Sequence, residues 1–155
     1  MNNKPSYLSR EGLERLRGEL DEMVGTRRVE VAQRIHDAKE HGDLTENAEY
    51  EDAKNEQAFV EGRIQALDAL IKNAILISEH HATDHVSIGT TVAVESAAAG
   101  LEEFHIVGSA EAKPTEGRIS NESPVGRALL GKKRGDKVVV HVPAGDFTYT
   151  VKEIR

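Results

Sequence analysis

Two helical stripes, separated by a ten-residue polar stretch, constrain this chain more than any other feature. The stripe positions recur in steps of three and four, as one face of a helix requires. Ser9, just before the first stripe, can cap its helix. The positions are Leu13, Leu16, Leu20, Met23 or Val24, Val31, Ile35 and Ala38, then Ala53, Gln57, Val60, Ile64, Leu67, Ile71 and Ala74. Neither helix can bury its stripe alone, so we expect them to pack as an antiparallel hairpin.

The first stripe has one interruption, at Arg27 and Arg28, where we expect an imperfect seam between the helices. Elsewhere charged and amide side chains fill the positions between stripe residues, which predicts a solvated outer face. Helices of about 30 residues, at about 1.5 Å per residue, predict a rod roughly 45 Å long.

The polar stretch between the stripes, residues 41–50, reads HGDLTENAEY and is expected to form the tip of the hairpin. Gly42 suits the end of one helix. Asp43 and Glu46 have the spacing of a capping box at the start of the next helix, where both carboxylates would favour the helix dipole. Capping is therefore one complete interpretation of these two acids.

The acid around the tip exceeds what capping requires. Residues 36–56 hold eight Asp and Glu side chains against two Lys, a net charge of −6 out of −7 for the whole chain. Carboxylates crowded together repel one another, and repulsion is tolerated at a solvent-exposed tip. The crowding indicates a cationic target for the tip, so a second interpretation of Asp43 and Glu46 stays open.

Composition excludes several other classes of function. A net charge of −7 argues against the nucleic-acid backbone as the main partner. Aromatic content of 4% without Trp weakens any interpretation that needs an aromatic pocket or a base-stacking platform. The chain has no Cys, no hydrophobic signal segment and no apolar run of membrane-span length. We expect a cytoplasmic protein without a membrane partner, acting as a monomer.

The apolar period changes from helical to two beyond about residue 79, which predicts an α+β protein with domains at 1–79 and 80–155. Residues 143–146 have the composition of a hairpin turn. Ser123 to Gly131 predicts one short helix, capped by Ser123 and stopped by Gly131. The expected four or five strands of an antiparallel sheet contain Val92, Val94, Phe104, Ile106, Val138, Val140, Val142, Phe147, Tyr149 and Val151.

Three separated motifs carry a resemblance to a known family. They are HGDLTENAEY at 41–50, FVEGRI at 59–64 and ISNESPVGRALLG at 119–131. Together they resemble the Gre family of bacterial transcript cleavage and elongation factors, most closely its GreA branch, over essentially the whole chain. The resemblance implies an N-terminal coiled-coil hairpin and a C-terminal domain similar to FKBP-type isomerases. It also implies entry into the secondary channel of backtracked RNA polymerase, with the second domain docked on the channel rim.

The resemblance further implies a role for the acids at the tip. Asp43 would be a Mg²⁺ ligand in the polymerase active site, and Glu46 would orient or deprotonate the attacking water. The protein would then stimulate RNA cleavage by the polymerase without being a nuclease, and Mg²⁺ would be shared only in the complex, with no cofactor in isolation.

Other residues near the tip have two interpretations each. Lys39 and Lys54 would contact the displaced RNA 3′ segment, or they are solvated lysines that offset local acid. Leu44 and Tyr50 would contact the polymerase, although Tyr50 can equally pack at the end of the hairpin. The histidines His36, His41, His80, His81 and His85 lack a regular metal-ligand spacing, so we expect no metal site among them.

Three rival functions follow from the same sequence. A prolyl isomerase or chaperone would need an aromatic cup, whereas residues 80–155 hold only Phe104, Phe147 and Tyr149, spaced as core residues of strands. A Gre-like inhibitor of the secondary channel would carry a more Asp-rich tip. A plain coiled-coil adaptor would leave the acid at the turn unexplained.

Overall fold

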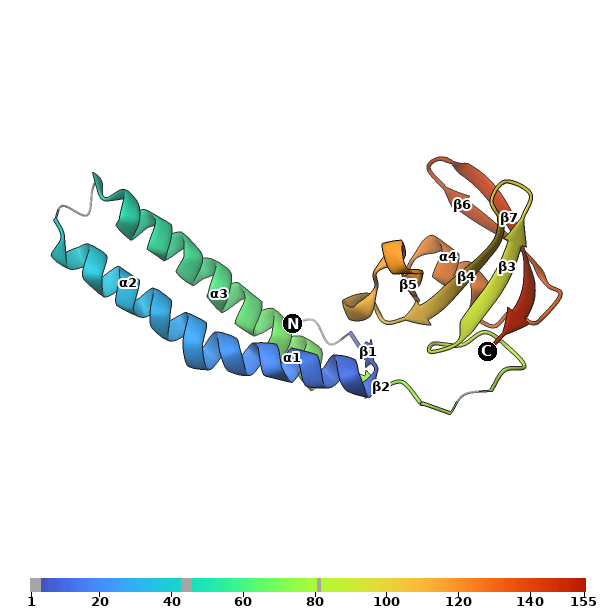
Figure 1. The fold of residues 1–155 in the computed structure, drawn as a ribbon, viewed down its shortest axis with the longest axis horizontal. Helices are drawn as coiled ribbons and strands as arrows, with labels where there is room; N and C mark the ends of the chain where they lie inside the picture. Colours follow the sequence, from blue (N-terminus) through green and yellow to red (C-terminus); the bar gives the residue numbers. More distant parts are fainter. Residues whose placement is uncertain (1–3, 43–45, 81) are drawn as a thin grey trace. The chain divides into compact units, whose positions relative to one another are not determined.

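The computed structural model describes residues 4–42, 46–80 and 82–155, and the chain divides into two compact units (Figure 1). The first unit contains Glu11–Asn73. The second combines Pro5–Arg10 with Ala74–Arg155. No described helix has both the length and the apolar character needed to cross a bilayer.

The first unit is the helical hairpin that the stripes predict. Its first arm runs through α1 (Arg10–Glu22), a short π-helix (Met23–Arg27) and α2 (Arg28–Glu40), and its second arm is the single helix α3 (Ala48–Lys72). Helices α2 and α3 lie side by side along their length (Figure 1).

The seam between the arms is built from the predicted stripe residues. Its buried members are Val31, Ile35, Ala53, Val60 and Ile64, and Leu20, Met23 and Tyr50 pack against them. Because each helix is apolar only along this line, the seam is what keeps both arms helical and paired.

The π-helix coincides with the predicted interruption of the stripe. A π-helix inserts one extra residue into a turn, so the residues that follow face a new direction. Arg27 and Arg28 leave the apolar line here and turn their guanidinium groups to acids of α3. The imperfect seam is therefore confirmed, with a rewound turn as its physical form.

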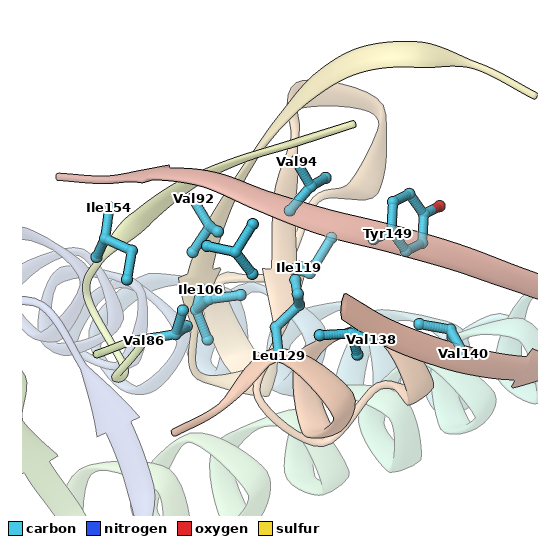
Figure 2. Packing of buried hydrophobic residues seen from close by; sticks show 11 residues of the cluster. Val86, Val92, Val94, Ile106, Ile119, Leu129, Val138, Val140, Tyr149 and Ile154 are labelled. Carbon is cyan, nitrogen blue, oxygen red and sulfur yellow. The ribbon is translucent and has the colours of Figure 1, made fainter. Parts of the chain in front are cut away.

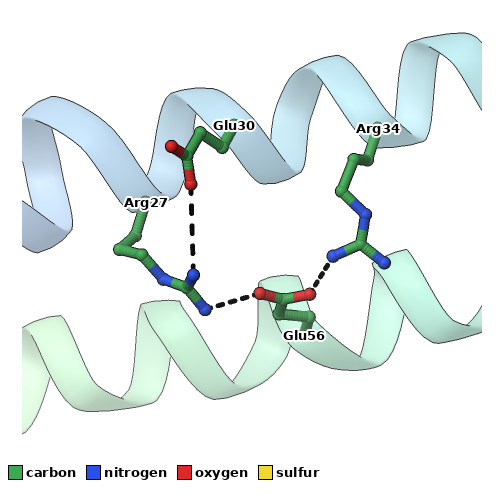
Figure 3. A network of polar contacts seen from close by, with 4 residues as sticks. All are labelled: Arg27, Glu30, Arg34 and Glu56. Carbon is green, nitrogen blue, oxygen red and sulfur yellow. Dashed lines mark hydrogen bonds and ion pairs between the residues drawn. The ribbon is translucent and has the colours of Figure 1, made fainter.

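Ion pairs between the arms add to the apolar contact of Met23 around this turn. Glu56 of α3 accepts hydrogen bonds from Arg27, at 2.6 Å, and from Arg34 (Figure 3). Arg28 binds both carboxylate oxygens of Glu61, at 2.7 and 2.9 Å. On α1, Glu19 accepts two bonds from Arg63, at 2.7 and 2.9 Å.

The second unit contains a five-stranded sheet in the order β5-β4-β3-β7-β6. Its strands are β3 (Thr91–Ser96), β4 (Gly100–Val107), β5 (Arg118–Ser120), β6 (Lys137–Val142) and β7 (Gly145–Ile154). All neighbours are antiparallel except β4 and β5, which are parallel. The predicted turn joins β6 to β7, because Val142 pairs with Gly145.

The core of this sheet lies under one helix, α4 (Pro124–Leu129). Ser123 caps the helix as predicted, since its Oγ accepts from the Gly126 backbone N–H at 3.0 Å. A side chain at Gly126 would place its Cβ 2.0 Å from the Ser120 carbonyl oxygen, so only glycine allows this close approach. Leu129 then reaches the centre of a cluster that includes Val94, Ile106, Val138 and Tyr149 (Figure 2).

A second, two-stranded sheet joins distant parts of the chain. Strands β1 (Ser6–Leu8) and β2 (Ala74–Leu76) are parallel, with Tyr7 opposite Ile75. Residues 5–10 thereby belong to the second unit, and the division by contacts falls between Asn73 and Ala74. The boundary near residue 79 stays a prediction.

Burial in the seam predicts that alanine substitution of two valines on α2 will have effects of different size on stability. Val31 is 2% exposed and Val29 is 60% exposed. We expect Val31→Ala to lower the free energy of unfolding by about 1.5–3 kcal/mol, because it removes buried methyl groups and leaves a cavity. Val29→Ala is expected to change it by less than about 0.5 kcal/mol. Chemical denaturation followed by circular dichroism at 222 nm measures both, and equal losses would contradict this seam.

The Glu19–Arg63 pair predicts a pH dependence. The hydrogen bond from Arg63 and its positive charge lower the pKa of Glu19 below its ordinary value of 4.5, and partial burial opposes them. The lowered pKa means that the pair stabilises the fold above about pH 4.5, and that this contribution disappears as pH falls through the folded-state pKa. Glu19→Gln should lower the free energy of unfolding by less than about 1 kcal/mol at pH 7, because solvent screens the pair. At low pH, where Glu19 is protonated in the wild type, the substitution should not change the free energy of unfolding.

Denaturation from pH 7 to pH 3 measures that difference, with Glu14→Gln on the exposed face of α1 as the matched control. The control is expected to stay within about 0.5 kcal/mol of wild type across the range. A deficit of Glu19→Gln that persists unchanged at low pH would assign the effect to packing instead of charge.

Candidate functional site at the closed end of the hairpin

The described residues on both sides of the tip show how the two helices end. Helix α2 stops at Glu40, and the His41 N–H donates to the Ala38 carbonyl at 3.3 Å. Gly42 follows with φ of 140°, a conformation that favours glycine, as predicted for a helix end. Asp43 and Leu44, the predicted Mg²⁺ ligand and polymerase contact, lie outside the described residues.

The start of α3 corrects one sequence interpretation. The capping-box reading began the second helix at Asp43 with Glu46 as its partner, whereas α3 begins at Ala48 and its cap is Asn47. The Asn47 side chain accepts from the Tyr50 backbone N–H at 3.1 Å. The helix dipole also favours two other acids in the first turn, Glu49 and Glu51. Helix α3 therefore has its cap without Asp43 or Glu46.

Glu46 is exposed to solvent immediately before the cap. Acids from both helices also line a polar pocket at the end of the hairpin, whose lining residues are Arg34, Asp37, Ala38, His41, Glu49 and Asp52. The predicted concentration of acid is therefore a feature of the folded hairpin end as well as of the sequence.

The remaining predicted contacts lie along the last turns of the hairpin. Lys39 is exposed on α2, and Lys54 is exposed on α3, where its Nζ donates to Gln57 at 3.2 Å. Tyr50 is partly buried and packs against the seam, which agrees with its structural interpretation. Their contacts with RNA or polymerase stay predictions.

Sequence reasoning overlooked Asn47. Its side-chain Nδ2 donates to the Ala38 carbonyl of α2 at 2.8 Å, in addition to the capping bond. A signal was present, because Asn directly before a helical segment with acids in its first turn is a common cap.

Within the described residues, no three His, Asp or Glu side chains are arranged to hold a metal ion.

The fold and the site together define a two-unit α+β protein that presents carboxylates on the closed end of a helical hairpin. Comparison with known families matches residues 6–76 to the N-terminal domain of transcription elongation factors, and residues 81–155 to the GreA/GreB C-terminal domain. The chain belongs to the GreA/GreB family, and it is a transcription elongation factor.

Individual relatives align over nearly the whole chain. "Transcription elongation factor GreA" of Roseiflexus sp. (strain RS-1) is 49% identical over 157 aligned positions, covering 100% of both chains. The protein of the same name from Thermoanaerobacter pseudethanolicus is 52% identical over 155 positions and 99% of both chains. Among solved structures, GreA factor homolog 1 (Gfh1) of Thermus thermophilus is 29% identical, with a TM-score of 0.46 over 98% of this chain and 99% of that chain.

Proposed function

We propose that this elongation factor inserts its helical hairpin into the secondary channel of backtracked bacterial RNA polymerase and stimulates the polymerase to cut its own transcript. The observation that carries the proposal is the exposed Glu46 at an acidic hairpin end whose helix is capped by a different residue, Asn47. Glu46 is thus available to a partner, because α3 does not use it as its cap.

The chemistry follows from what carboxylates bind. Mg²⁺ prefers carboxylate and water oxygens, so Asp43 supplies a ligand to a Mg²⁺ held in the polymerase active site. With a second Mg²⁺ in that active site, the two ions would stabilise the attacking and the leaving oxygens at the phosphodiester that is cut. Glu46 orients the attacking water or accepts its proton.

The other parts of the chain have supporting roles in this proposal. The protein activates the polymerase in the cytoplasm without catalysing cleavage itself. The unit formed by 5–10 and 74–155 docks on the channel rim, and Lys39 and Lys54, both exposed near the tip, contact the displaced RNA 3′ end.

Two rivals remain as outcomes of experiments. An isomerase would need accessible aromatic rings, whereas Phe104 and Tyr149 pack edge-to-face in the core with centroids 5.9 Å apart. Burial, together with the Glu102 charge, raises the pKa of the Tyr149 hydroxyl. An inhibitor of the channel would slow nucleotide addition without shortening RNA.

The decisive test uses a stalled, backtracked elongation complex with Mg²⁺. Asp43→Asn and Glu46→Gln should each lower the rate of stimulated cleavage at least 100-fold, because the amide is neutral and is both a weaker Mg²⁺ ligand and a weaker base than a carboxylate. Helix content and the unfolding midpoint should stay close to those of wild type. Gel analysis of end-labelled RNA measures the cleavage rate.

Glu51→Gln is the matched control, because Glu51 is also an exposed acid near the tip, on the first turn of α3. It should cut at the wild-type rate. Full activity of Asp43→Asn would reassign Asp43 to a structural role. Slower nucleotide addition without RNA shortening, or a positive proline-isomerisation assay, would favour a rival.

A further inference from the structure

The Asn47 side chain makes two hydrogen bonds in opposite directions across the hairpin end. Its Oδ1 accepts from the Tyr50 N–H of α3 at 3.1 Å, and its Nδ2 donates to the Ala38 carbonyl of α2 at 2.8 Å. A short side chain can do this only if it carries both an acceptor and a donor, as the Asn amide does. One residue thereby joins the last turn of one helix to the first turn of the next.

The carbonyl that receives this bond lies in the last turn of α2, where carbonyls lack partners within the helix. The His41 N–H reaches the same oxygen at 3.3 Å, so Ala38 is the point at which both sides of the tip converge. Ala38 is itself 3% exposed, which keeps this point on the packed side of α2. Glu46 is bonded directly to Asn47, so its backbone is held at a fixed place relative to α2.

We propose that Asn47 is a positioning residue for stimulated transcript cleavage: its amide clamps the two helix ends together and so fixes where Glu46 is presented. The proposal rests on the proposed function, because it assumes that carboxylates at the tip act in the polymerase active site. A catalytic group displaced by about 1 Å can lose about 100-fold in rate, so a clamp of this kind affects the chemical step.

Capping alone does not account for the second bond. Asn, Asp and Ser are all strong caps, since each offers a side-chain oxygen to the first turn. Only Asn among them carries an amide donor long enough to reach a carbonyl of the neighbouring helix. The two roles of Asn47 can therefore be separated by substitution.

Asn47→Ser and Asn47→Asp both retain the cap acceptor and lose the donor to Ala38. We expect each variant to keep helix content and the concentration of factor that gives half-maximal cleavage within about two-fold of wild type. The maximal cleavage rate on the backtracked complex should fall 10- to 100-fold. A loss of maximal rate at unchanged half-maximal concentration is a result that weakened folding or weakened polymerase binding would not give.

Ala48→Asp is the matched control for the charge that Asn47→Asp introduces. Ala48 is exposed on the first turn of α3, so the control adds the same charge next to the intact clamp. It should cut at the wild-type rate. Wild-type cleavage by Asn47→Ser would overturn the proposal, and so would a loss of rate in Ala48→Asp equal to that in Asn47→Asp.

A measurement on the protein alone separates this proposal from the proposed function. In Asn47→Asp, amide hydrogen exchange should become faster at His41 by at least about five-fold, whereas the Tyr50 amide, still capped, should keep its protection. Unchanged exchange at His41 would overturn the clamp even if wild type cuts RNA. Faster exchange at His41, combined with a wild-type protein that cuts no RNA, would confirm the clamp and contradict the proposed function.

Discussion

The packing of two amphipathic helices along one narrow apolar line is the interaction on which the rest of this structure depends. Neither arm of the hairpin has a second apolar face, so each is a stable helix only because the other covers it. Where the line is interrupted, the first arm rewinds into a π-helix, and Arg27 and Arg34 bind Glu56 across the seam. Apolar burial and ion pairing thus occur along the same stretch, and both join the same two helices.

A paired arm of this kind allows charge to accumulate at its closed end. The acids there repel one another, but solvent screens this repulsion. The apolar seam between the helices therefore keeps their ends paired. The cap of α3 is the neutral side-chain amide of Asn47, so the carboxylate of Glu46 is not needed to cap this helix. Helix capping and the proposed chemistry at the tip are therefore assigned to neighbouring residues.

Periodicity predicted most of the fold, because burial on one face imposes a period on the sequence. It located both helical arms and strands β3, β4, β6 and β7, whereas the cap and stop residues located the short helix that begins after Ser123. It missed β1 and β5, which have three residues each and depend on pairing with distant segments. The Asp-x-x-Glu spacing put the cap of α3 four residues too early, because Asp43 and Asn47 are both residue types that commonly cap helices.

We propose that the tip completes the coordination of a Mg²⁺ in another enzyme's active site. The most direct measurement is the rate of transcript cleavage by a backtracked polymerase as Mg²⁺ is titrated, with and without saturating factor. An added carboxylate ligand should lower the Mg²⁺ concentration for half-maximal cleavage by at least ten-fold. A factor that raises the maximal rate and leaves that concentration unchanged would contradict ligand donation.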